Sequence, residues 1–235
     1  MTLIAATTQG AAGFLITDAA SCHADGTVAR IASKVVTFPG VVGAVAFEGL
    51  AHPDDIADIA QAMGITTARD LVRNLGALAI EMKSWTMQWY PAEQHPDVLL
   101  CAVVYDSEVG PSTWIGHSGG RIARSGMIAG VPKMARAYWN YGDPADALNR
   151  PVNMTDHALF NVESDGLSLA EAARCGVWDP KSPGHRVGGF IELTTVDRSG
   201  VHTRRLREWN DTIGQPIRPD AGHRHGRPPA LEHSA

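Results

Sequence analysis

FLITDAASCHADGTVARIASKVVTF, residues 14–38, begins and ends in β-rich sequence. Asp18 lies at the end of one predicted strand, and Lys34 lies within the next. Working outward from this stretch, alternating apolar residues predict strands at 2–8, 12–18, 33–38 and 41–47. Gln9-Gly10 joins the first two strands and Pro39-Gly40 the last two, and both dipeptides are turn signals. The first 50 residues are therefore expected to form a sheet of short strands.

Two helices are expected after these strands. His52-Pro53 has a proline at the first helical position, acidic residues follow it, and Gly64 is placed to end the helix. The second helix is predicted to begin near Thr67, which forms a weak capping box with Asp70. Its apolar stripe is Leu71, Leu75, Leu78 and Met82.

The remaining elements return to a mainly β pattern. The sequence predicts strands at 97–105, 112–116, within 120–130, at 187–196 and at 200–206, and helices at 132–140 and from the capping box Ser168–Glu171 to Gly176. Consecutive strands joined by tight turns indicate antiparallel sheets with segregated helices, an α+β fold. One domain is expected over residues 1–213, and residues 214–235, rich in Pro, Gly, Arg and His, are expected to form a disordered tail.

Charge and composition argue against nucleic acids and membranes as partners. The formal net charge of −5 and the lack of clustered Lys and Arg before the C-terminus argue against nucleic acid as a partner. The longest notable apolar run, residues 98–105, is strand-length, so no membrane interaction is expected. Three widely spaced cysteines fit no disulfide framework or metal pair and are expected to be reduced thiols of a cytoplasmic protein.

The N-terminus, MTLIAATTQG, raises the question of catalysis. A threonine hydroxyl needs a nearby base, and an N-terminal threonine brings its own α-amine, whose free pKa is about 7.7–8.0. A lysine beside it lowers the pKa of hydroxyl and amine, a carboxylate holds that lysine, and a glycine turn stabilises an oxyanion. Thr2, Lys34, Asp18 and Gly49 have the residue types for these four roles. Alternatively, Thr2 is an ordinary strand residue.

The runs at 14–38 and at 42–51 (VGAVAFEGLA) resemble the N-terminal region of proteasome β-type subunits and their bacterial two-component protease relatives, which are N-terminal-nucleophile hydrolases. With Thr2 as the first mature residue, the family's aspartate and lysine coincide with Asp18 and Lys34, and its oxyanion turn coincides with Glu48-Gly49, all without a gap. Weaker similarity extends to about residue 206. Glu48 departs from the small residue usual in the family.

The resemblance implies a four-layer αββα sandwich of two antiparallel sheets flanked by helices. It also implies a threonine-type peptidase whose Thr2 is exposed when Met1 is removed. It implies a homo-oligomeric ring that acts on peptides or proteins and needs no cofactor, and it leaves open whether an ATPase is a partner. Two other functions stay open: an inactive structural subunit of this fold, and an amidase for a small amide.

The resemblance also assigns supporting residues. The substrate pocket is expected to be lined by Ser21, Ala32, Val36, Phe47 and Leu50, and Asp179 and Ser125 are expected to support the nucleophile. This lining is mostly apolar and predicts preference for an apolar substrate side chain, although Val36 and Phe47 would serve equally as core residues. No metal site is expected, because His117 and His185 lack ligand partners at suitable spacing and the histidines of the tail are expected to be solvated.

Overall fold

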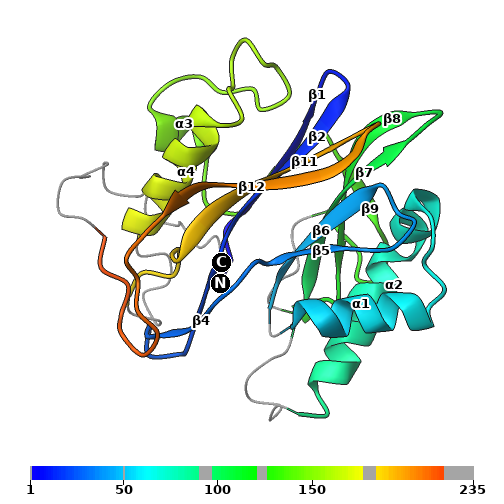
Figure 1. Ribbon diagram of the computed structural model, residues 1–235, viewed down its shortest axis with the longest axis horizontal. Coiled ribbons are helices and arrows are strands. Elements are labelled where there is room, and N and C mark those ends of the chain that lie inside the picture. Colours follow the sequence, from blue (N-terminus) through cyan, green and yellow to red (C-terminus); the bar gives the residue numbers. More distant parts are fainter. Residues whose placement is uncertain (1, 50, 90–96, 121–125, 177–183, 220–235) are drawn as a thin grey trace.

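Two five-stranded antiparallel sheets form most of the computed structural model, which describes residues 2–49, 51–89, 97–120, 126–176 and 184–219 (Figure 1). The first sheet contains, in spatial order, β10 (Ala137–Trp139), β1 (Ile4–Gln9), β2 (Ala12–Asp18), β11 (Phe190–Asp197) and β12 (Gly200–Glu208). The second sheet contains β5 (Val35–Thr37), β6 (Gly43–Glu48), β7 (Leu99–Asp106), β8 (Gly110–His117) and β9 (Lys133–Ala135). A two-stranded sheet pairs β3 (Ala20–Cys22) with β4 (Val28–Ile31).

The four helices of the described chain are α1 (Pro53–Ala62), α2 (Ala68–Thr86), α3 (Pro144–Leu148) and α4 (Ser164–Cys175). The two helices predicted after the first strands are confirmed. Pro53 opens α1, and in α2 the Thr67 side chain accepts the Asp70 N–H while the Asp70 carboxylate accepts the Thr67 N–H, which is a complete capping box. The predicted apolar stripe of α2 is fully buried, and each such side chain stabilises the fold by about 1.5–3 kcal/mol relative to exposure.

Three apolar clusters show how these elements pack. One joins α1 and α2 to β5, β6 and β7 of the second sheet. Another joins β1 and β2 of the first sheet to β6 and β7 of the second, so the two sheets face each other. The third joins the first sheet to α4, with part of α3 packed against it. Figure 1 accordingly shows α1 and α2 beside the second sheet and α3 and α4 beside the first. The predicted α+β class with antiparallel sheets is confirmed.

Residues 132–140 do not form the predicted helix, and that prediction is wrong. β9 pairs with β8, and β10 pairs with β1, so this segment passes from one sheet edge to the other. The strand pairing satisfies backbone groups at two sheet edges, and tertiary context of this kind overrides local helix propensity. Of the residues from 120 to 130, where strands were expected, the structure describes 120 and 126–130, and these form no strand.

The helix expected from Ser168 begins earlier, at Ser164. Asn161 Oδ1 accepts the N–H groups of Glu163 and Ser164, and the Asp165 carboxylate accepts the Asn161 N–H at 2.7 Å. Ser168 lies inside α4, where its hydroxyl donates to the Ser164 carbonyl. The predicted helix end is confirmed, because α4 stops at Cys175 and Gly176 caps it.

The tail predicted from residue 214 begins too early. Gly214 N–H donates to the Val28 carbonyl, Val28 N–H donates to the Gln215 carbonyl, and Pro216 forms a β-bridge with Thr27. Ile217 is buried against Ala20 and Val28. The segment after β12 is therefore packed on β3 and β4 at least as far as Ile217, and residues 220–235 of the predicted tail lie outside the described residues.

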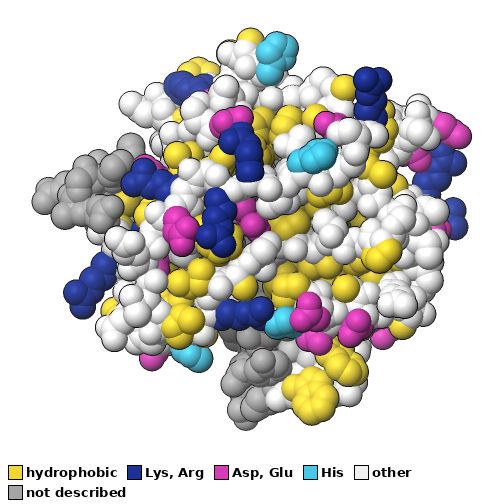
Figure 2. Space-filling view, in the orientation of Figure 1, with side chains coloured by type: hydrophobic (Ala, Val, Ile, Leu, Met, Phe, Trp, Pro, Cys, Tyr) yellow, Lys and Arg dark blue, Asp and Glu magenta, His cyan; other side chains and the backbone are white. Residues whose placement is uncertain are grey.

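The exposed strand β12 carries several arginines, and ion pairs link them to acidic residues. Arg204 pairs with Glu163, Arg205 with Glu208 at 3.0 Å, and Arg207 with Glu171 at 3.2 Å. On the face seen in Figure 2, cationic and acidic side chains are interspersed. No helix in the described part of the chain combines the length and apolar character that a membrane crossing needs.

At Gly76, α2 lies so close to the loop before β9 that alanine is expected to lower the stability of the protein. Alanine normally stabilises a helix interior relative to glycine by about 1 kcal/mol. At Gly76, however, a Cβ would lie 2.2 Å from the Gly130 carbonyl. We therefore expect Gly76→Ala to lower the free energy of unfolding by about 1–3 kcal/mol in urea titrations. Exposed Ala77→Gly is the control for propensity alone, and a stabilised Gly76→Ala variant would contradict this packing.

Candidate active site

The centre of the candidate site is a buried ion pair between the first sheet and the segment before β5. Asp18 ends β2, and Lys34 directly precedes β5. Lys34 Nζ lies 2.8 Å from Asp18 Oδ1, and only 4% of the lysine side chain and none of the aspartate side chain are exposed. The ammonium also donates to the Ala20 carbonyl at 2.5 Å. The structure thus brings together two residues that the sequence placed in one site.

Asp18 also holds three backbone amides. Its Oδ1 accepts the Leu3 N–H at 2.9 Å, and its Oδ2 accepts the N–H groups of Ala20 and Gly188 at 3.2 Å each. Both carboxylate oxygens therefore have hydrogen-bond donors. One side chain therefore fixes the start of β1, the chain after β2 and the chain before β11 relative to Lys34.

Thr2 lies at the start of this arrangement. Its neighbour Leu3 donates to the same carboxylate oxygen as the Lys34 ammonium, so the lysine nitrogen and the Leu3 amide are two hydrogen bonds apart. Thr2 itself is only 6% exposed. Thr2 is therefore a buried residue, and the amide that directly follows it is held by the carboxylate that holds Lys34.

Asn140 is a site residue that sequence reasoning missed. Its Nδ2 donates to the Thr2 carbonyl and, at 3.3 Å, to Glu48 Oε2, while its Oδ1 accepts the Ile4 N–H at 2.8 Å. The side chain thereby grips the peptide groups on both sides of Leu3. Asn140 follows β10, and a lone asparagine in that predicted helix gave no sequence signal for this role.

The Glu48-Gly49 turn follows β6 and lies beside the same asparagine. Gly49 has φ +124°, a conformation that favours glycine, and a Cβ there would lie 2.2 Å from the Asp97 carbonyl oxygen. Only glycine fits this turn. Glu48, the residue that departs from the family pattern, turns its carboxylate toward Asn140 and so toward the Thr2 segment.

Tyr141 and Cys22 border the buried charges. Burial raises the pKa of Tyr141 well above its ordinary value, and the carboxylates of Asp18 and Glu48 raise it further. Burial also raises the pKa of Cys22, although the Lys34 ammonium acts in the opposite direction. At neutral pH both groups are therefore held in their neutral forms, which argues against Cys22 as the nucleophile.

The predicted pocket residues are placed in different surroundings. Ser21 is exposed in β3, and Ala32 is half-buried before Lys34. Val36 and Phe47 are each 5% exposed and belong to the apolar cluster beneath α1 and α2, so they act as core residues whether or not they also border a substrate. Leu50, Ser125 and Asp179 lie outside the described residues.

The described histidines form no metal centre with other residues. Within the ranges that the structure describes, no three His, Cys, Asp or Glu side chains gather in a way that could hold a metal ion. His117 Nδ1 instead accepts the Gly119 N–H at 3.0 Å, and burial lowers the pKa of its imidazole.

No family model matches the sequence, and no curated protein is significantly similar to it.

The buried pair makes a prediction about stability. Removing one partner of a buried ion pair typically costs about 3–5 kcal/mol. We expect Lys34→Met to lie near the lower end, because three backbone N–H groups still compensate the Asp18 carboxylate. Arg69→Met, which removes a cation whose side chain is 58% exposed, should cost less than about 1 kcal/mol. Equal losses in chemical denaturation would contradict the distinction.

Asn140 makes a second prediction. Asn140→Asp keeps an acceptor for Ile4 but loses the donor to Thr2 and sets a carboxylate against Glu48. The melting temperature at pH 7 should fall, and Glu48→Gln in the same chain should recover part of the loss, since it supplies a new donor. A double-mutant cycle should give a coupling of about 0.5–3 kcal/mol; strictly additive effects would show that the two side chains are independent.

Proposed function

We propose that this protein is a threonine-type N-terminal-nucleophile hydrolase, a proteasome-like peptidase whose Thr2 becomes the first residue when Met1 is removed. Its own α-amine acts as the general base, Lys34 lowers the pKa of the hydroxyl and amine, Asp18 holds Lys34, and the Gly49 N–H stabilises the oxyanion of the acyl intermediate. Each role follows from the chemistry of the group and its place in the sequence.

One observation carries the proposal. Asp18 Oδ1 accepts hydrogen bonds both from the Lys34 ammonium and from the amide directly after Thr2. A lysine on a sheet edge would ordinarily be solvated, and burying its charge is costly unless it is paired. Here the charge is buried and shares a carboxylate oxygen with the amide that directly follows Thr2, which supports a role for the pair in activating Thr2.

The packing supports the finer fold assignment. The sequence of apolar clusters runs from α1 and α2 through the second sheet and the first sheet to α3 and α4, as expected for an αββα sandwich. The strands at 133–139 depart from the helix that the sequence predicts over 132–140. We therefore base the proposal on the N-terminal half of the site, where the residue pattern and the contacts agree.

The proposed mechanism begins with a deprotonated α-amine on Thr2. The amine takes the hydroxyl proton as Oγ1 attacks the scissile carbonyl, and the resulting oxyanion is held by the Gly49 N–H. The amine returns the proton to the leaving nitrogen as the carbon–nitrogen bond breaks. Water then attacks the ester, and the amine takes a proton from it. The bond between the acyl carbon and Oγ1 breaks, the product leaves as a carboxylic acid, and the amine returns the proton to Oγ1. A free pKa of about 7.7–8.0 suits the amine to this exchange near neutral pH.

The proposal extends to the working form of the protein. We propose a homo-oligomeric ring that encloses its peptide or protein substrates in the cytoplasm, and a preference for an apolar side chain in a pocket bordered by Ser21, Ala32, Val36, Phe47 and Leu50. The first two are accessible or half-buried, whereas Val36 and Phe47 would contribute only the pocket floor.

The test combines mass spectrometry with a covalent probe. Intact mass of the purified protein should lack Met1, and a peptide-like β-lactone should form one adduct that maps to Thr2. Thr2→Ala should abolish the adduct, Thr2→Ser should retain it because serine keeps the hydroxyl, and Lys34→Ala should slow labelling by at least a hundredfold. Circular dichroism at the assay temperature shows that each variant is folded.

Other results would point to the two alternatives. A retained Met1 and no adduct would favour an inactive structural subunit, because a blocked amine cannot act as the base. A Thr2 adduct, together with turnover of small amides but not of peptides, would favour an amidase. Labelling at a residue other than Thr2 would exclude the threonine mechanism.

A further inference from the structure

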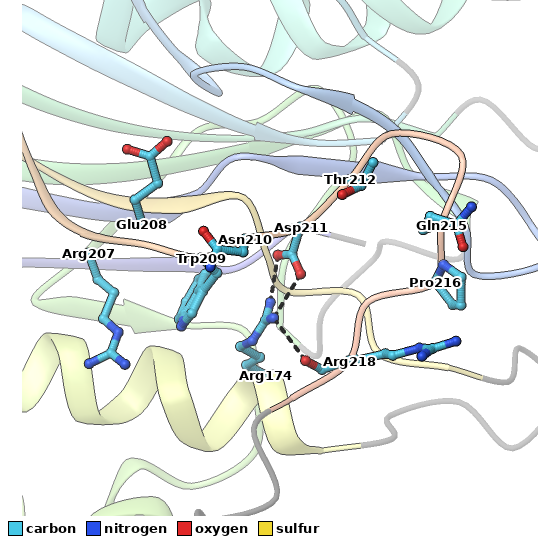
Figure 3. A pocket seen from close by; sticks show the side chains of 10 residues that line it. All are labelled: Arg174, Arg207, Glu208, Trp209, Asn210, Asp211, Thr212, Gln215, Pro216 and Arg218. Atoms are coloured by element: carbon cyan, nitrogen blue, oxygen red, sulfur yellow. Dashed lines mark hydrogen bonds and ion pairs between the residues drawn. The ribbon is translucent and has the colours of Figure 1, made fainter.

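A second buried ion pair is connected to Asp18 through hydrogen bonds of residues 187–189. Arg174, near the end of α4, makes a bidentate pair with Asp211, with both nitrogen–oxygen distances at 2.8 Å. Only 7% of the arginine side chain and 4% of the aspartate side chain are exposed. Figure 3 shows the two groups facing each other. Both line a pocket of about 450 Å³, and Trp209 lies against the guanidinium. Such a pair needs further hydrogen bonds to offset its desolvation.

Arg174 Nη2 donates to the Arg218 carbonyl at 3.3 Å, and the other further hydrogen bonds go to residues 187–189. Arg174 Nη1 donates to the Val187 carbonyl at 3.0 Å, and Asp211 Oδ2 accepts the Gly189 N–H at 2.7 Å. Between these contacts, Gly188 N–H donates to Asp18 Oδ2 at 3.2 Å. Three consecutive residues are thus held on one side by the Arg174–Asp211 pair and on the other by the carboxylate that holds Lys34.

The link is reinforced by the carbonyls of the two glycines. Gly188 accepts the N–H groups of Ala19 and Ala20, which directly follow Asp18, and Gly189 accepts the Trp209 N–H. Residues 187–189 therefore bond to the Asp18 carboxylate, to the two residues that follow it and to the chain that carries Asp211. A displacement of the Asp211 carboxylate would therefore reach the Asp18 carboxylate through the adjacent Gly189 and Gly188 amides.

Residues 188 and 189 have no room for a side chain. A Cβ on Gly188 would lie 2.5 Å from Asp211 Oδ2 and 3.0 Å from Arg174 Nη1. A Cβ on Gly189, which has φ +75°, would lie 2.8 Å from Ile31 Cγ2. The backbone can approach the ion pair closely because both residues are glycine.

We propose that Arg174 and Asp211 are positioning residues for the nucleophile site: by clamping residues 187–189 they fix the Asp18 carboxylate, and with it Lys34 and the Thr2 segment. The inference rests on the proposed hydrolase function and adds to it two residues far along the chain that touch none of the reacting groups. Their effect falls on the rate of the chemical step, because misplacing catalytic groups by about 1 Å can cost a hundredfold in rate.

The experiment separates positioning from stability with two variants. Asp211→Asn keeps the shape but removes the charge. Arg174→Met with Asp211→Leu removes the whole pair, a replacement that in other proteins often leaves stability unchanged. With the β-lactone probe, the maximal rate of Thr2 acylation should fall about tenfold or more in both variants, while the probe concentration for half-maximal rate changes less than twofold.

Asp165→Asn is the matched control on the same helix. It removes the charge from an ion pair with Arg150 but keeps an oxygen that can accept the Asn161 N–H, and its partners lie outside residues 187–189. Its acylation rate should stay within twofold of the wild type. If a folded Asp211→Asn variant acylates as fast as this control, the inference is overturned, and if the double variant does not fold, the Asp211→Asn result decides alone.

Amide hydrogen exchange distinguishes failure of this inference from failure of the proposed function. In Asp211→Asn, the amides of Gly188, Ala19 and Ala20 should exchange at least tenfold faster than in the wild type, while amides in β7 stay within twofold. This readout needs no activity. Unchanged exchange overturns the link even if Thr2 reacts; faster exchange in a protein whose Thr2 never reacts supports the link and overturns only the hydrolase.

Discussion

The buried ion pair between Asp18 and Lys34 is the interaction on which the other features of the site depend. A lysine ammonium in an apolar interior requires a charged partner and hydrogen-bond acceptors, and Asp18 and the Ala20 carbonyl supply them. Because the same carboxylate accepts three backbone N–H groups, the position of Lys34 is tied to the start of β1 and to the chain before β11. The charge that would activate Thr2 is thus placed by the fold, and the fold is in turn stabilised by satisfying that charge.

Around this pair, distant parts of the chain meet through backbone groups that a few side chains hold. Asn140 ties the Thr2 segment to the Glu48-Gly49 turn, and the Arg174–Asp211 pair reaches Asp18 through residues 187–189. Gly49, Gly188 and Gly189 leave room for these approaches, since a Cβ at any of them would meet another atom closer than 3.0 Å. Contacts of this kind would help to hold the proposed nucleophile in one orientation.

The sequence predicted local elements well wherever local signals agreed with tertiary packing. The hairpin of β1 and β2 has a turn signal and α2 a weak capping box, and both formed as predicted, as did the last pair of strands, β11 and β12. The prediction failed at residues 133–139, where helix-forming residues became edge strands because two sheets had unpaired edges there. It also failed at residues 214–217, whose composition suggested disorder but whose backbone pairs with β4 and the residue before it.

The sequence by itself determined the α+β class, because that class follows from periodicity and turn signals. It also raised the hypothesis of a threonine nucleophile, which depends on the chemistry of Thr2, Asp18, Lys34 and Gly49 and on the register that the family resemblance implies for them. Only the tertiary structure decided that Asp18 and Lys34 form a buried pair and that Asn140 joins Thr2 to Glu48. It also decided that Arg174 and Asp211 are linked to Asp18 through residues 187–189. These contacts join residues more than a hundred positions apart or depend on the desolvation of a charge. Neither long-range proximity nor burial is encoded in the local pattern of one sequence, since both arise only when the sheets and helices pack.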